Sequence, residues 1–207
     1  MKTFSNIISY VFIPLLIPTY GMILLMFTPL FQMFPTPYHV LAITGTLLFT
    51  GILPALPVYL MMRNKQISDT FLSKQEERTM PYLFTMLGDI FWVLFLWRNL
   101  MFPIDFVLVA AGSVLCIIVT MFINLKWKIS AHMGAMGGLV GGICAVSYIS
   151  AINPVGVIIL AIIFSGLVGI SRLYLKAHSL SQVLWGFALG LFSVILPPFI
   201  YYFFFHH

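Results

Sequence analysis

The sequence predicts an all-α membrane protein, a polytopic bundle of six to seven transmembrane helices, and three observations lead to this prediction. Hydrophobic residues make up 61% of the 207-residue chain and charged residues only 7%, whereas about a quarter of the residues in a soluble domain are charged. The mean hydropathy is +1.08. Several apolar runs approach or exceed the roughly 20 residues that cross the hydrocarbon core of a bilayer. These runs are continuous rather than alternating, which favours helices over a β-barrel.

Seven apolar runs are predicted to be membrane spans, with edges placed to within about three residues. They cover residues 7–31, 39–62, 81–98, 102–124, 133–151, 154–174 and 180–204. The first run contains Pro14, Pro18 and Gly21, and we expect the helix to kink there. Because this run continues past Pro18 to about Leu30 without a small-residue cleavage site, we expect no cleavable signal peptide.

The third run is short, and it is followed by Arg98, Asn99 and Pro103, which predict its end. The fourth and fifth runs each contain one cysteine, Cys116 and Cys144. Both cysteines have apolar neighbours, so we expect small packing residues rather than a disulfide or a metal site. We assign no role to the terminal histidine pair.

The charged residues gather on one predicted side of the bundle. The segments before span one and after spans two, four and six share that side. They carry Lys2, Arg63, Lys65, Lys74, Arg78, Lys126, Lys128, Arg172 and Lys176. The opposite side carries Arg98. By the positive-inside rule the charged side is cytoplasmic, and we expect a bacterial inner membrane. The net charge of +5 predicts membrane lipids and phosphorylated lipids as partners and no nucleic acid, because no soluble module could hold a duplex.

Three segments on the charged side contain polar residues that a helix end does not need. The first segment, 74–81, contains Lys74 and Arg78 just before the third span. The second lies at the start of the fifth span and contains Ser130 and His132. The free N–H groups and the dipole of a helix amino terminus favour an anion there. Taken alone, the first segment is also explained as an ordinary charged loop, and a lone histidine as a structural residue.

Glycines recur along the fifth span at every fourth position, namely Gly134, Gly138 and Gly142. This pattern lets another helix approach closely. The glycines therefore need no catalytic role, but they would hold His132 on a rigid element.

The third polar segment runs from Ser171 to Gln182 and contains Arg172 and His178. His178 and Gln182 are four residues apart, so on a helix they share a face and can form a hydrogen bond. An arginine at the end of an apolar run can simply extend to the interface. The combination of Ser-Arg, five residues, His, three residues and an amide is much less common by chance.

Together these segments resemble the superfamily of type-2 phosphatidic acid phosphatases and vanadium haloperoxidases. The pattern of that family is a Lys…Arg-Pro element, a Pro-Ser-Gly-His element and Ser-Arg-x5-His-x3-Asp. The third element matches at Ser171, Arg172 and His178, with Gln182 in place of Asp.

The other two elements match less closely. The second matches at Ser130 and His132, with Ile129 and Ala131 replacing Pro and Gly. In the first, Arg78 is followed by Pro81 rather than by an adjacent Pro, and Lys74 lies closer to Arg78 than is usual. The resemblance covers residues 74–182. The length of the chain predicts a single membrane domain, 1–207, and the resemblance implies a phosphatase-type helical core over about 63–204.

The predicted topology agrees with one shared site. Two spans separate the first element from the second, and two more separate the second from the third, so all three reach the same membrane face.

The resemblance implies a metal-independent lipid phosphate phosphohydrolase. His178 would attack phosphorus to form a phosphohistidine, His132 would act as general acid and then base, and Gln182 would orient His178. The implied phosphate-binding residues are Lys74, Arg78, Ser130, Ser171 and Arg172. No cofactor is expected, because the sequence lacks a carboxylate cluster or a Cys/His set with metal-ligand spacing.

Gln182 leaves a second interpretation open. An amide accepts a hydrogen bond but brings no charge, and an Asp-to-amide change in another histidine-based site costs about 10⁴ in rate. In the first interpretation the protein is a phosphatase, and its substrate is predicted to be a phospholipid or a polyprenyl (di)phosphate. Alternatively, the protein binds or transports phospholipid without hydrolysis.

Asp89 and Asp105 lie within spans, where an ionisable group is a functional candidate. Asp69, Glu76 and Glu77 are the carboxylates that could replace the missing charge.

Overall fold

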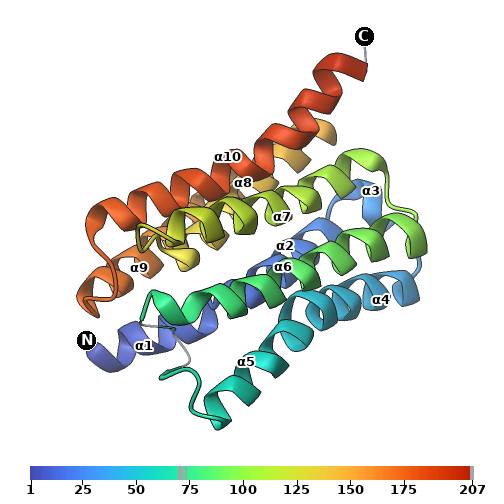
Figure 1. Ribbon diagram of the computed structural model, residues 1–207. Coiled ribbons are helices and arrows are strands. Elements are labelled where there is room, and N and C mark those ends of the chain that lie inside the picture. The colour runs from blue at the N-terminus through green and yellow to red at the C-terminus, as the bar shows by residue number, and fades with distance from the viewer. Residues whose placement is uncertain (70–71, 73, 206–207) are drawn as a thin grey trace.

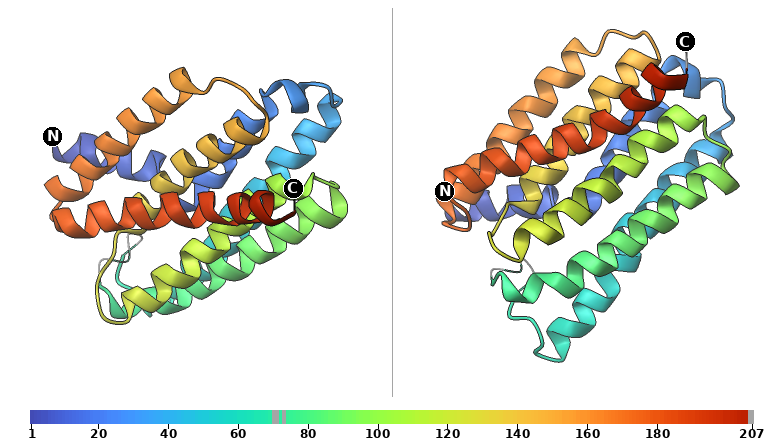
Figure 2. Two further views of the ribbon diagram at one scale, coloured as in Figure 1. Left: turned by 90° about the horizontal axis from the view of Figure 1, so that it is seen from above. Right: turned by 45° about the horizontal axis from the view of Figure 1, so that its top comes forward.

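The computed structural model describes residues 1–69, 72 and 74–205, and every regular element in these residues is helical. Within them, seven helices are long and apolar enough to cross a membrane, which confirms the predicted fold class. They are Lys2–Met26, Thr36–Arg63, Glu76–Asn99, Ile104–Asn124, Ala131–Ile149, Val155–Tyr174 and Leu180–Phe205. Figures 1 and 2 show one bundle with the two termini at opposite ends. The terminal His206 and His207 lie outside the described residues.

The first span is broken near the predicted kink. It consists of α1 (Lys2–Val11), the 3-10 turn η1 (Pro14–Leu16) and α2 (Ile17–Met26). Both predicted edges were wrong by several residues. The helix begins earlier because the polar start of α1 buries Ser5 and Ser9 against the bundle. It ends earlier because the extended Thr28 leads into Pro29, which has no N–H to continue a helix.

The second and third spans each contain a wider π-helical turn. After the short α3 (Pro29–Gln32), the second span consists of α4 (Thr36–Thr46), η2 (Leu47–Ile52) and α5 (Leu53–Arg63). The third consists of η3 (Glu76–Arg78), α6 (Thr79–Leu94) and η4 (Phe95–Asn99). The turn η2 lies just before Pro54, whose nitrogen cannot donate to a regular helix. The third span begins before the predicted residue 81, because the charged turn η3 runs directly into α6.

The remaining spans are α7 (Ile104–Asn124), α8 (Ala131–Ile149), α9 (Val155–Tyr174) and α10 (Leu180–Phe205). Their edges confirm the predictions to within two residues. Half of the most apolar window of α8 is buried, a larger share than in any of the other six spans among the described residues. Consequently α8 is the central helix, and what it carries at its amino terminus is held inside the bundle.

Glycines bring α8 and α10 into backbone contact, but on α8 the tight positions are Gly137 and Gly141, which lie beside the every-fourth set Gly134, Gly138 and Gly142. A Cβ on Gly141 would lie 2.6 Å from Leu191 O, and one on Gly186 would lie 2.6 Å from Ser130 O. A Cβ on Gly190 would overlap the carbonyl oxygen of Gly134. Only glycine allows this approach. The contact fixes the start of α10 against the start of α8, where the predicted histidines lie.

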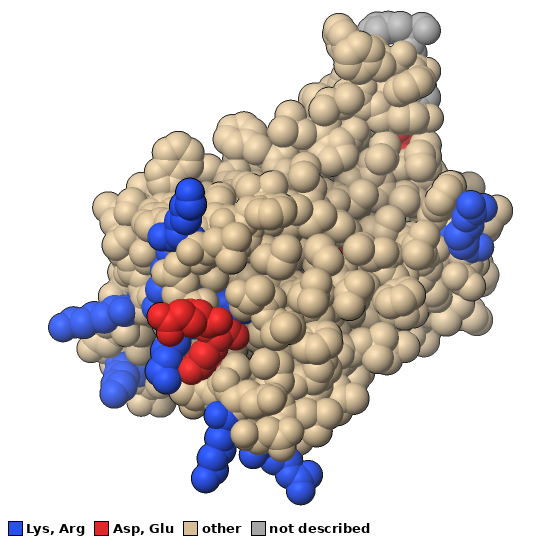
Figure 3. Space-filling view, in the orientation of Figure 1, with Lys and Arg blue, Asp and Glu red and all other residues tan. Residues whose placement is uncertain are grey.

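The charged side chains gather at the end of the bundle that contains the amino terminus. Figure 3 shows most of the visible Lys and Arg atoms there, around a cluster of Asp and Glu atoms. Arg98 lies at the opposite end, where its guanidinium stacks 4.0 Å from the Trp97 ring centroid. The fold therefore has one charged end and one nearly uncharged end.

Candidate functional site

Four predicted site residues, from four separate parts of the chain, line one cavity at the charged end. Arg78 lies just before α6, His132 in the first turn of α8, Arg172 in the last turn of α9 and His178 two residues before α10. None of the four is more than 8% exposed. The cavity has a volume of about 810 Å³. Two imidazoles and two guanidinium groups thus face a shared space inside the bundle.

Gln182 determines which ring nitrogen of His178 carries the proton. The amide oxygen Oε1 accepts from the backbone N–H of Ser179 at 3.0 Å, which fixes the amide orientation because a backbone N–H cannot bond the amide nitrogen. The same oxygen lies 3.2 Å from His178 Nδ1, and the carbonyl of Lys128 lies 3.3 Å from it. Since both partners of Nδ1 are acceptors, Nδ1 carries the proton and donates. The lone pair is left on Nε2.

The surroundings of His178 favour its neutral form. Burial, followed by the positive charges of Arg78, Arg172 and Lys128, lowers the pKa of His178 to about 3. The hydrogen bond with Gln182 acts in the opposite direction but is smaller. A neutral imidazole with a free lone pair is the form that can act as a nucleophile.

Arg78 is anchored by backbone carbonyls. Its Nε donates to Leu72 O at 2.7 Å, and Nη1 donates to Ile129 O at 3.2 Å and to Tyr82 Oη at 3.5 Å. No hydrogen bond from Nη2 to a described residue is present. These bonds hold the guanidinium in one orientation and leave the Nη2 donors for a ligand, which suits binding of a phosphoryl group.

Gln75, in the segment before α6, is hydrogen-bonded to Asn124 at the end of α7. Gln75 Nε2 donates to Asn124 O at 2.6 Å, and Asn124 Nδ2 donates back to Gln75 O at 3.1 Å. This pair joins the segment before Arg78 to the end of α7. The carbonyl of Leu72 accepts from Arg78, so Leu72 and Gln75 lie next to the site.

His132 contacts the first span, a partner that local sequence patterns do not reveal. Its Nε2 lies 3.2 Å from the carbonyl oxygen of Ser9 in α1. Because a carbonyl only accepts, Nε2 carries a proton and donates. His132 is also within electrostatic range of Arg172, His178 and Arg78. The first span therefore completes the surroundings of this histidine, although it lies outside the predicted core.

Lys128 is a further cation close to the site, and its place there was not predicted from the sequence. It is half-buried, and burial together with the charges of Arg78 and Arg172 lowers its pKa. The charge of Asp69 acts on both Lys128 and Arg172. Of the three acidic residues Asp69, Glu76 and Glu77, Asp69 is therefore the one whose charge acts on cations of the site. The signal that could have identified Lys128 is its place two residues before Ser130, on the segment that carries His132.

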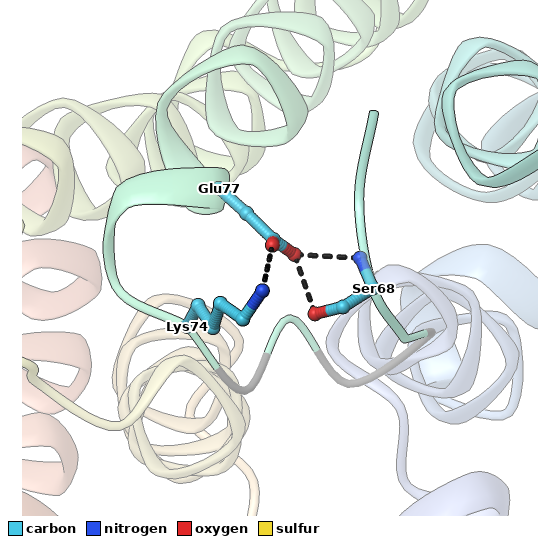
Figure 4. A network of polar contacts seen from close by, with 3 residues as sticks. All are labelled: Ser68, Lys74 and Glu77. Carbon is cyan, nitrogen blue, oxygen red and sulfur yellow. Dashed lines mark hydrogen bonds and ion pairs between the residues drawn. The ribbon is translucent and has the colours of Figure 1, made fainter. Parts of the chain in front are cut away.

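Lys74 is not brought together with the other predicted residues. Its side chain is 63% exposed and forms an ion pair with Glu77 at 3.1 Å. Glu77 also accepts from the backbone N–H and the hydroxyl of Ser68 (Figure 4). The charge of Lys74 is therefore balanced within its own loop.

The two predicted serines are buried beside the cavity rather than among its described lining residues. Ser130 is the N-cap of α8, and its Oγ accepts from Met133 N at 3.4 Å. Its backbone N–H donates to Gln182 O at 3.3 Å, which joins the starts of α8 and α10. Ser171 is 2% exposed. Ser130 thus has a structural role that needs no ligand.

Beyond the histidines, the cavity continues along the bundle. One wall is a polar face of α6 and α7 that includes Tyr82, Asp89, Ser113 and Thr120. Asp89 is 5% exposed and forms a hydrogen bond with Ser113. Asp105, the other acid within a span, lies in the first turn of α7, where the helix dipole stabilises a negative charge. Among the described residues, no group of three or more His, Cys, Asp or Glu side chains could hold a metal ion.

Comparison of the chain with protein-family models, with curated proteins and with solved structures finds no match.

Proposed function

We propose that this protein is a membrane lipid phosphatase that releases phosphate through a phosphohistidine. The observation that carries the proposal is the position of the two histidines and two arginines, buried at one end of a cavity inside a membrane bundle. The resemblance to type-2 phosphatidic acid phosphatases at Ser171, Arg172 and His178 supports it. A cavity of this kind suits a lipid whose charged head lies at the charged end.

In the first step, His178 Nε2 attacks phosphorus. The N–P bond forms while the bond from phosphorus to the lipid oxygen breaks, and the electron pair stays on that oxygen. His132 donates a proton to it and the lipid alcohol leaves. The imidazolium form of His132 that this requires is stabilised by the adjacent phosphate dianion. Arg78 and Arg172 neutralise the phosphoryl oxygens.

In the second step, neutral His132 accepts a proton from water as the water oxygen attacks phosphorus. The N–P bond breaks, its electron pair returns to Nε2, and inorganic phosphate leaves. The proton on Nδ1 remains in place through both steps, held by Gln182 and by the carbonyl of Lys128. Lys128 adds a positive charge close to His178.

Phosphate release from a panel of lipid phosphates in detergent tests the proposal. We expect His178→Ala to abolish activity and the matched control His39→Ala to retain it. His39 lies in α4, away from the site, where its Nε2 is 2.7 Å from Phe31 O. Acid-labile phosphate on the protein should disappear with His178→Ala. No release from any substrate by the unaltered protein, or release unchanged by His178→Ala, would contradict the proposal.

A second candidate function is binding or transport of a phospholipid without hydrolysis. One observation favours it: Gln182 Oε1 is shared between Ser179 and His178 and brings no negative charge. The intermediate with a positive imidazole is then less stable than it would be beside a carboxylate. Lipid binding without phosphate release would support this second function.

We further propose that the charged end, and with it the site, faces the cytoplasm of a bacterial inner membrane. The support is the charge distribution, in which Lys and Arg gather at one end (Figure 3).

A further inference from the structure

The cavity that begins at the histidines reaches the opposite end of the bundle. At the charged end its lining includes Arg172 and His178, and at the other end it includes Thr28, Phe102 and Asn153. These last three residues lie in the connections between spans one and two, three and four, and five and six. The cavity therefore extends through both halves of the membrane thickness.

The distant half of the cavity is suited to hydrocarbon. Asp89 lies eleven residues along the third span from Arg78, a helical distance of about 16 Å. Beyond Asp89, the described lining contains no further charged side chain, and the walls are residues such as Met22, Trp92 and Phe106. A polar headgroup would find its charged partners only at the near end, while an apolar chain could lie along the rest.

The cavity also has a side that faces lipid. Its lining includes Pro14 and Pro18 of the first span and Val58, Tyr59 and Met62 of α5. Tyr59 is 59% exposed, so this wall is reached from outside the bundle. Figure 1 shows α5 diverging from α1 towards the charged end. A lipid could enter here from the surrounding leaflet with its head already at the charged end.

We infer that the substrate carries a single hydrocarbon chain longer than one leaflet, as in a polyprenyl phosphate or diphosphate. The inference rests on the proposed function. The chains of a two-chain phospholipid fill one leaflet, about half of the roughly 30 Å hydrocarbon thickness. Such a lipid has no use for a cavity that continues past Asp89 to Phe102 and Asn153. A long single chain would occupy the whole length.

Two matched substitutions separate the halves of the cavity. Ala110 and Ala135 both line it. Ala135 lies about 6 Å along α8 from its charged-end start, and Ala110 lies about 21 Å along α7 from its charged end. Phosphate release is measured with a long polyprenyl phosphate, a short one whose chain ends before Asp89, and a two-chain phosphatidate. Gly166→Ala, on α9 in open space, is the control.

Ala110→Phe should lower kcat/KM for the long chain about tenfold or more and change the short-chain value less than about twofold, because a ring in the distant half competes only with the long chain. Ala135→Phe should lower both. Folding of each variant is verified by its thermal transition in detergent. Equal or better activity on the two-chain lipid, or no difference between chain lengths in Ala110→Phe, would overturn the inference while leaving the phosphatase proposal intact.

A photoreactive group at the far end of the long chain provides a readout independent of hydrolysis. Labelling of α7 near Phe106 or of α8 near Ser147 would support the inference even if no phosphate were released. The absence of phosphate release would refute only the proposed function. Labelling confined to the outer surface of the bundle or to the near half would overturn it.

Discussion

The His178–Gln182 pair separates two contributions that a carboxylate normally makes together. Gln182 orients the ring and selects the tautomer, because its oxygen is fixed by Ser179 N–H and faces Nδ1. It brings no negative charge, and its hydrogen bond favours a positive ring less than burial and the neighbouring cations disfavour it. Two arginines and Lys128 act on the same imidazole, so the local field at His178 is positive. A dianionic substrate would itself supply the missing negative charge.

Replacing Gln182 by glutamate adds that charge with little change in size. We expect Gln182→Glu to raise the rate of phosphohistidine formation about tenfold or more, since the carboxylate stabilises the positive ring formed on attack. Gln182→Leu, which removes the acceptor, should lower the rate. Single-turnover phosphate release measures both. A Gln182→Glu protein slower than the unaltered one would show that the amide is required.

His178 also predicts a pH dependence of stability. Its pKa is lowered to about 3 in the folded protein but is about 6.5 in an unfolded chain. The unfolded chain binds the extra proton first, so the contribution to stability is complete above pH 6.5 and is lost as pH falls from 6.5 towards 3. The slope approaches about 1.4 kcal/mol per pH unit. Thermal unfolding in detergent should show a smaller loss for His178→Gln than for the unaltered protein; equal losses would contradict this assignment.

Lys128 and Lys74 form a second pair for comparison. The charge of Lys128 acts on His178, whereas Lys74 is balanced by Glu77. We expect Lys128→Ala to lower kcat/KM about tenfold through loss of a positive charge close to His178, and Lys74→Ala to change it less than about threefold. Steady-state kinetics on the same lipid phosphate decides, and a larger effect from Lys74→Ala would restore Lys74 to the site.

Among the elements, the α8–α10 contact determines how the site is assembled. It joins the start of α8, with His132, to the start of α10, with Gln182, and Ser130 N–H donates across the contact. The glycines permit this approach, but they cannot bring in Arg78 or Arg172. Arg172 arrives through α9, which packs against both helices. Arg78 arrives at the start of α6, which packs against α7, and α7 in turn contacts α8 and α10.

Gly190→Ala tests the close contact. The added Cβ would overlap Gly134 O, and forcing the two backbones apart should cost about 1–3 kcal/mol or more. Gly166→Ala is the matched control, because its Cβ would meet nothing within 4 Å and alanine favours a helix. Thermal unfolding in detergent should show a lower Tm for the first variant and an equal or higher Tm for the second. Equal transitions would mean that α8 and α10 separate without cost.

The spans were predictable from sequence because hydropathy and proline position are local properties, and five of the seven have edges within three residues of the prediction. The amphipathic α1 was placed too late because its buried Ser5 and Ser9 are polar. The contact of His132 with Ser9, the approach of Lys128 and the cavity along the bundle join residues far apart in the chain. No pattern within one segment encodes them. The ion pair of Lys74 with Glu77 and the hydrogen bonds of Gln75 with Asn124 likewise depend on folding rather than on a sequence pattern.

For the whole molecule, the one-ended charge has two consequences that can be separated. Some cations at the charged end are exposed and can orient the chain in a membrane. Arg78 and Arg172 are each only 3% exposed and line the cavity, and under the proposed function they would bind the phosphoryl group instead. A count of cations by side therefore combines orientation with function, and the orientation needs a direct measurement.

Accessible cysteines at the two ends provide it. In a background with Cys116 and Cys144 replaced by alanine, Asn64→Cys places a thiol in the exposed loop after α5, and Met33→Cys places one at a position that is 84% exposed at the other end. If the charged end is cytoplasmic, a membrane-impermeant maleimide added to intact cells should label Met33→Cys and not Asn64→Cys. Inverted vesicles should give the opposite result. The reverse pattern would place the histidine site on the outer face, where it would receive lipid phosphates from the outer leaflet.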